Sequence, residues 1–155
     1  MELLVLQKGN KYVVEDKKQR LLYSVKKKGF SSRYTLLDAS NYNLYSLLQT
    51  GDERKPAFTI ILNDNTFMTM ICKSLFLDPT IEAEGSGMRF TLASKDRKNF
   101  TILKDDAEVG KITTRTTLNG ELQYEVEIDN YVFDDYIPLF AVAIDRAFGD
   151  MNRNK

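Results

Sequence analysis

The 155-residue sequence contains no histidine and a single cysteine, Cys72. Without histidine, Ser-His and Cys-His nucleophile systems are excluded, and so is the side chain best suited to acid-base catalysis near neutral pH. One cysteine allows no intrachain disulfide, and zinc or iron sites built from the usual His and Cys ligands cannot be assembled within the chain. We therefore expect no metal, no other cofactor and no enzymatic activity.

The remaining catalytic candidates have ordinary structural interpretations. Cys72 follows the apolar stretch 68–71, which favours a buried and inert thiol. Paired carboxylates occur at Glu82 and Glu84 and at Asp105 and Asp106, where a solvated strand face and a hairpin turn are the simpler interpretations. The segment 85–87, Gly-Ser-Gly, lacks the lysine and the spacing of a phosphate-binding loop, so we interpret it as a turn.

Long apolar runs and a secretory signal are also missing. Residues 1–6 are too short and lack the basic region of a signal peptide, and the uncharged run 136–144 is far below the roughly 20 residues of a membrane span. We therefore expect a cytoplasmic protein without a transmembrane span. Lys plus Arg and Asp plus Glu both total 22, and this balance does not favour binding to nucleic acid.

One stretch predicts a helix. Residues 136–144 are apolar on every helical face, so this helix must be surrounded by protein. Asp134 or Asp135 is predicted to cap its start, Pro138 to lie in its first turn, and Gly149 to end it. Asp145 needs a partner if it is buried, and Arg146 suits the helix C-terminus, so both are expected to be structural.

Before this helix, short segments rich in Val, Ile, Leu and Tyr alternate with turn residues and predict strands. A helix is kept as an alternative for 42–49, where the alternation is imperfect. A closed sheet around the apolar helix satisfies both elements, and we predict one mainly β domain over residues 1–155, monomeric, with a closed antiparallel barrel of about twelve strands around a central C-terminal helix. The predicted strands are 3–7, 11–15, 21–27, 33–37, 42–49, 58–62, 67–73, 80–84, 88–92, 100–103, 108–116 and 121–128.

The sequence resembles the tubby C-terminal-like superfamily, and most closely its LURP-one-related branch, to which phospholipid scramblases are also related. The resemblance is carried by Tyr-Val-Val-Glu-Asp at 12–16, Leu-Tyr-Ser-Val at 22–25, Tyr-Thr-Leu-Leu-Asp at 34–38 and the apolar segment 140–148 with its aspartate. It implies a barrel around a helix. Tubby domains bind phosphoinositides and scramblases act at membranes, so the resemblance also implies a lipid-related function.

Basic residues are concentrated near the N-terminus: residues 1–35 carry nine bases and three acids, a net charge of +6. Since successive turns of an antiparallel meander alternate between the two ends of a sheet, we predict that six of these bases meet at one rim. Lys17, Lys18 and Arg20 belong to the opposite end, roughly 25 Å away along the strands. The six predicted ligand-binding residues are Lys8, Lys11, Lys26, Lys27, Lys28 and Arg33.

Two hypotheses for function follow. The first is a binding module for an anionic ligand such as lipid headgroups, peripheral at the membrane, because anionic membrane surfaces attract basic segments. The second is a protein-interaction or structural domain that uses strand edges or an exposed rim and binds no small ligand. Asp129, Asp134 and Asp135 can supply oxygen ligands to calcium, and scramblases resemble this segment, although helix capping and a solvated turn are the simpler interpretation.

Overall fold

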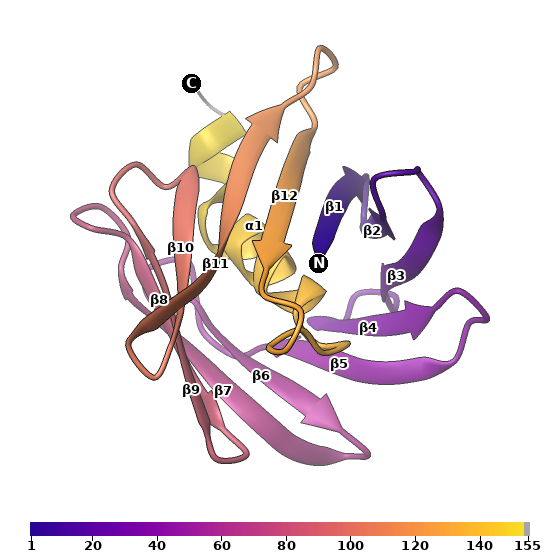
Figure 1. The fold of residues 1–155 in the computed structure, drawn as a ribbon, viewed down its shortest axis with the longest axis horizontal. Coiled ribbons are helices and arrows are strands. Elements are labelled where there is room, and N and C mark those ends of the chain that lie inside the picture. Colours follow the sequence, from indigo (N-terminus) through magenta and orange to yellow (C-terminus); the bar gives the residue numbers. More distant parts are fainter. Residues whose placement is uncertain (154–155) are drawn as a thin grey trace.

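A computed structural model describes residues 1–153 of the chain. Its strands pair in an unbroken antiparallel ring that closes through β1 and β12, and α1 lies inside the ring (Figure 1). The predicted barrel around a C-terminal helix is confirmed. The elements are β1 (Glu2–Lys8), β2 (Lys11–Glu15), β3 (Leu21–Lys27), β4 (Arg33–Asp38), β5 (Asn43–Gln49), β6 (Ala57–Leu62), β7 (Asn65–Ser74), β8 (Thr80–Gly85), β9 (Met88–Ser94), β10 (Asn99–Lys104), β11 (Ala107–Thr116), β12 (Leu122–Ile128) and α1 (Pro138–Arg153).

Alternation of side chains along the strands builds the core. In β12, Tyr124 and Val126 are buried whereas Glu125 and Glu127 point outward, as the period of two predicts. The segment 43–49 is strand β5, so the helical alternative is wrong. Its imperfect alternation coincides with a register shift opposite Leu36 and Leu37 of β4, a bulge that leaves one extra residue on β5.

The apolar helix is enclosed as its composition requires. Every residue from Leu139 to Ile144 is fully buried. The Phe140 ring lies 5.1 Å from the Phe90 ring of β9 and 5.9 Å from the Tyr136 ring, measured between centroids. Aromatic pairs at such distances contribute beyond simple burial, so this part of α1 is anchored to the barrel wall.

Pro138 lies in the first turn of α1, as predicted, but the predicted cap and the predicted end at Gly149 are wrong. Pro138 is the first helical residue, but the Asp135 carboxylate accepts a hydrogen bond from the Tyr23 hydroxyl, and that of Asp134 accepts one from the Asp135 amide. Tight turns satisfy the first amides instead, since the amide of Phe140 donates to the Ile137 carbonyl at 2.9 Å. At the other end, Gly149 lies within the helix.

The six connections that leave odd-numbered strands, from β1–β2 to β11–β12, lie at one end of the barrel. The five connections that leave β2, β4, β6, β8 and β10, together with the β12–α1 connection, lie at the other end. We call the end where α1 begins the proximal end and the end where it terminates the distal end. The side-chain amide of Asn152 donates to the carbonyl of Arg97, in the β9–β10 connection, at 2.8 Å. The C-terminal part of α1 is thereby fixed at the distal end.

Candidate functional site

The structure places the six predicted basic residues at the distal end, on β1–β4 and their connections. We call these six residues the basic rim. Lys8 is the register partner of Lys11, and Lys11 is in turn the register partner of Lys26, so three lysines form a row across β1, β2 and β3. Like charges directly opposite each other destabilise a sheet, so this row is kept at a cost in stability.

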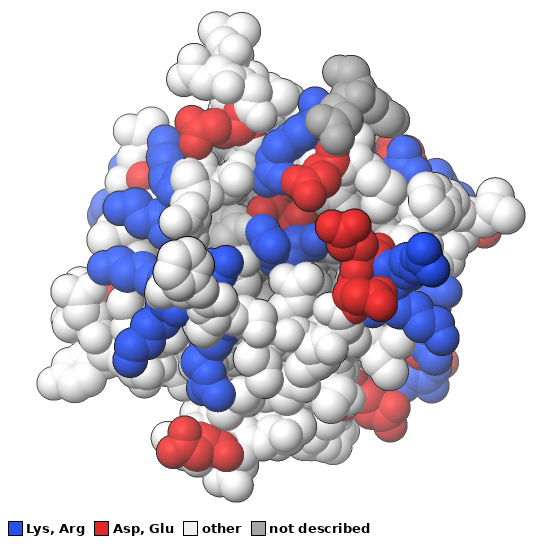
Figure 2. All heavy atoms as spheres, turned by 180° about the vertical axis from the view of Figure 1, so that it is seen from behind, with Lys and Arg blue, Asp and Glu red and all other residues white. Residues whose placement is uncertain are grey.

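No residue of the basic rim forms an ion pair with any residue of the described part, 1–153. At the proximal end, Lys17 pairs with Glu2 and Arg20 with Asp16 at 2.7 Å, whereas Lys18 forms no ion pair within residues 1–153. Figure 2 shows Lys and Arg side chains gathered on the left of the face it presents, over the N-terminal strands. The basic rim therefore presents charge to solvent without intramolecular compensation.

A hollow in the surface lies along this row. It is an open groove of about 550 Å³ lined by Asn10 and by four lysines of the basic rim, which are Lys8, Lys11, Lys26 and Lys27. The four ammonium groups can each donate three hydrogen bonds, and the Asn10 amide adds both donor and acceptor capacity. Such a surface suits a ligand with several anionic oxygens.

A smaller cavity of about 90 Å³ adjoins the groove, and Lys27 and Asn10 line both. We call it the inner cavity; its other lining residues are Gln7, Gly9, Tyr12, Tyr34 and Arg146. Arg146 is exposed, its guanidinium lies 5.6 Å from the Tyr34 ring centroid, and its Nε donates to Gln49 Oε1 at 3.3 Å. Two cationic side chains thus meet at one small polar cavity.

Sequence reasoning assigned Arg146 only a structural role and did not connect it with the basic rim. One signal was available: an arginine that directly follows a buried stretch of helix must emerge where the helix leaves the barrel. That is the end where the meander places the lysines. Its distance in sequence from Lys27 concealed the proximity.

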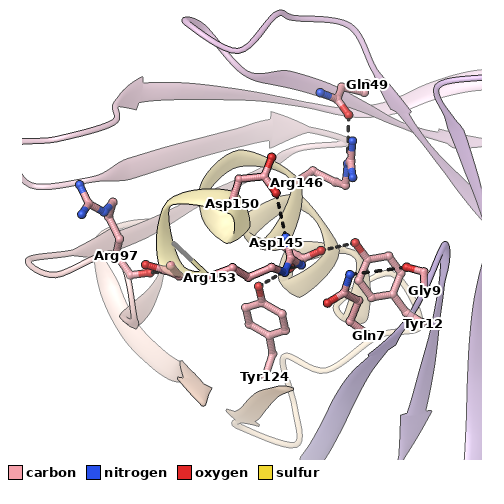
Figure 3. Close-up of polar contacts among 11 residues, drawn as sticks. Gln7, Gly9, Tyr12, Gln49, Arg97, Tyr124, Asp145, Arg146, Asp150 and Arg153 are labelled. Atoms are coloured by element: carbon pink, nitrogen blue, oxygen red, sulfur yellow. Dashed lines mark hydrogen bonds and ion pairs between the residues drawn. The ribbon is translucent and has the colours of Figure 1, made fainter. Parts of the chain in front are cut away.

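Asp145 is the buried acid beneath this site. Tyr12 donates to one carboxylate oxygen, and Tyr124 and Arg153 donate to the other at 2.6 Å each (Figure 3). Three side chains therefore act as the partners that a buried Asp145 requires. A Cβ on Gly149 would lie 2.6 Å from Asp145 Oδ1 and 3.0 Å from Arg153 Nη1, so the glycine gives Arg153 room to fold back onto Asp145.

Because of this network, the stability of the fold should decrease at alkaline pH. Burial, and then the neighbouring Asp145 carboxylate, raise the pKa of Tyr12 and of Tyr124 above its ordinary value. A group whose pKa is higher in the folded state stabilises fully below its unfolded pKa of about 10 and loses that contribution as the pH rises above it. The loss is about 1.4 kcal/mol per pH unit for each tyrosine that stays protonated in the fold.

We therefore expect the melting temperature to fall steeply above pH 10, and Tyr12→Phe to make that fall shallower while lowering stability at neutral pH through the lost hydrogen bond to Asp145. Thermal melts followed by circular dichroism between about pH 7 and about pH 11 measure both effects. Tyr131→Phe, at a residue 84% exposed, is the control and should change neither. If the melting temperature of Tyr12→Phe falls above about pH 10 as steeply as that of the unaltered protein, the buried Tyr12 hydroxyl is not a source of the alkaline loss of stability.

The acidic candidates lie at the proximal end. The backbone carbonyl of Asp129 accepts hydrogen bonds from the amides of Val132 and Phe133. The Asp135 carboxylate accepts one from the Tyr23 hydroxyl. Within residues 1–153, no group of three or more His, Cys, Asp or Glu side chains is arranged to hold a metal ion. These residues lie in the β12–α1 connection, where Asp134 and Asp135 make other contacts and do not cap the helix.

The catalytic candidates are dispersed. Cys72 is 5% exposed, and burial raises the pKa of its thiol, which disfavours the reactive thiolate. Glu82 lies 3.7 Å from the Lys73 ammonium on the outer wall, and Asp105 and Asp106 form the β10–β11 turn.

In the part of the chain that the structure describes, no helix combines the length and the apolar character needed to cross a bilayer.

The closed antiparallel ring with one buried helix along its interior defines the class of helix-filled, twelve-stranded β-barrels. The chain belongs to the LURP-one-related family, whose model matches residues 1–145. It is also similar to the X-ray structure of a protein from Arabidopsis thaliana, at 17% sequence identity over 97% of this chain and 90% of that one, with a TM-score of 0.43. No curated protein matches the chain.

Proposed function

We propose that this chain is a non-enzymatic binding module that holds an anionic, phosphate-bearing ligand at the basic rim, and that lipid headgroups are the ligand class. The observation that carries the proposal is the row of directly opposed lysines along a groove of about 550 Å³, none of them paired with an acid within residues 1–153. The repulsion between these lysines destabilises the free protein, and a bound polyanion would offset this repulsion.

The absence of histidine and the buried thiol of Cys72 support a role in binding rather than catalysis. We further propose that residues 1–155 act as one monomeric unit in the cytoplasm, peripheral at the membrane. The ring closed through β1 and β12 leaves no open edge among the twelve described strands. It therefore disfavours both edge-to-edge association and a partner that adds a strand, which was one form of the protein-interaction hypothesis.

The test is cosedimentation of the protein with vesicles of phosphatidylcholine and phosphatidylserine. We expect binding at low ionic strength that weakens steeply as salt rises from about 0.05 M to about 0.5 M, because the Debye length falls from above 10 Å to a few ångström. Pure phosphatidylcholine vesicles are the control and should not bind. Binding that is unaffected by salt would contradict a site made of exposed lysines. If the protein does not bind anionic vesicles even at low salt, lipid headgroups are not the ligand and the protein-interaction hypothesis takes their place.

A further inference from the structure

Four large apolar side chains project from the distal end. Within residues 1–153, Phe30 and Leu118 are fully exposed, Leu77 is 85% exposed and Phe76 is 71% exposed. None of them has a polar atom in its side chain that would favour contact with water. We call these four residues the apolar tips.

The apolar tips are spaced around the rim. Phe30 lies in the β3–β4 connection, Phe76 and Leu77 in the β7–β8 connection, and Leu118 in the β11–β12 connection. These are alternate members of the six distal connections, so the tips occupy three separate positions around a closed ring. Side chains at three separate positions around the distal end can all contact one flat surface. In a protein–protein interface, by contrast, the apolar residues form a contiguous core.

The two ends of the barrel also differ in charge. With one flanking residue on each side, the six distal connections carry ten basic and five acidic side chains, a net charge of +5. The six proximal connections, including the one into α1, carry four basic and nine acidic side chains, a net charge of −5. Within residues 1–153, the most exposed large hydrophobic side chains at the proximal end are those of Tyr42 and Tyr131, which have hydroxyl groups.

The β3–β4 connection joins the two features. The carbonyl of Lys28 accepts hydrogen bonds from the amide and the hydroxyl of Ser31, at 3.2 and 2.7 Å, so Phe30 is presented at the tip of a closed turn. Lys27 and Lys28 precede this turn, and Arg33 follows it. An apolar side chain that is flanked by bases matches the boundary between acyl chains and anionic headgroups.

We infer that the barrel docks end-on onto an anionic bilayer, with the distal end facing the membrane, the basic rim on the headgroups and the apolar tips inserted below them. This inference rests on the proposed function and narrows it, because a soluble polyanion would use the lysines and leave the tips in water. The acidic proximal end is turned away from the bilayer, so the charge distribution orients the approach.

The sequence lacks tryptophan, so a single introduced tryptophan reports its own surroundings. In Phe30→Trp we expect the emission to shift to the blue when phosphatidylserine-containing vesicles are added, and to be quenched by lipids brominated on the acyl chains. Tyr131→Trp, at the proximal end, is the matched control and should show neither change. A Phe30→Trp emission that stays at its aqueous position while the protein cosediments with vesicles would overturn insertion and leave the proposed function standing.

A second variant separates the bilayer from a soluble ligand. Replacing Phe30, Phe76, Leu77 and Leu118 with alanine should weaken vesicle binding about tenfold or more, since buried apolar area is lost. Binding to inositol hexakisphosphate, a soluble polyanion, should be unchanged because the lysines remain. If the unaltered protein binds this polyanion but not vesicles, docking to a bilayer is wrong and only the anion site survives; if it binds neither, the proposed function fails as well.

Discussion

Phe140→Asp is expected to abolish folding. The Phe140 side chain is fully buried between Phe90 and Tyr136, and truncating a buried phenylalanine alone costs about 3 to 5 kcal/mol. The aspartate adds an unpaired charge inside the barrel, at a further several kcal/mol. The sum reaches the roughly 5 to 15 kcal/mol by which typical domains are stable, so we expect insoluble or unfolded protein with no cooperative melting transition.

Phe140→Leu is the matched control for this experiment. It keeps the site apolar, should cost about 1 kcal/mol and should melt cooperatively at a somewhat lower temperature. Ala143→Lys tests the same enclosure from another position, because Ala143 is also fully buried. A soluble Phe140→Asp protein with a sharp transition in circular dichroism would contradict the enclosed helix.

The sequence was sufficient for the barrel because its local signals agree with one another. The run 136–144 admits no solvated helical face, and the twelve alternating segments supply a sheet to enclose it. The cap and the C-terminal end of the helix were mispredicted because tertiary contacts replaced the local signals. Tyr23 binds the Asp135 carboxylate, and Gly149 is needed to bring Arg153 onto Asp145 rather than to end the helix.

The candidate site was predictable only in part. The position of Lys8, Lys11 and Lys26 at one end follows from meander geometry, because it depends on neighbouring strands. Arg146 belongs to α1, and its position beside Lys27 depends on how α1 is rotated and translated inside the barrel. The apolar tips were missed for a different reason: meander geometry places their three loops at one end, but a single Phe or Leu in a loop is common, and only the structure shows that all four side chains are exposed there.

Replacing Lys26, Lys27 and Lys28 with glutamate is expected to remove the proposed binding to anionic vesicles. Lys26 and Lys28 are exposed and Lys27 is partly exposed, so the core is untouched. A glutamate at position 26 would face Lys11 across the strands and replace a repulsive pair with an attractive one, so the melting temperature should stay the same or rise slightly.

The expected loss of affinity follows from the charge. Each base near an anionic surface contributes about 1 kcal/mol, so removing three attractions and adding three repulsions weakens binding by about 3 to 6 kcal/mol, or more than a hundredfold. Cosedimentation with vesicles of phosphatidylcholine and phosphatidylserine at about 0.15 M salt measures the loss.

Lys17 and Lys18 provide the control because they lie in the β2–β3 connection at the proximal end. Glutamate at both positions would break the exposed pair of Lys17 with Glu2, which contributes little to stability. The seven residues of β3 separate the two groups by roughly 20 Å, and at about 0.15 M salt the Debye length is about 8 Å. The proximal variant should therefore bind nearly as well as the unaltered protein; equal losses in both variants would mean that net charge, and not the basic rim, carries the attraction.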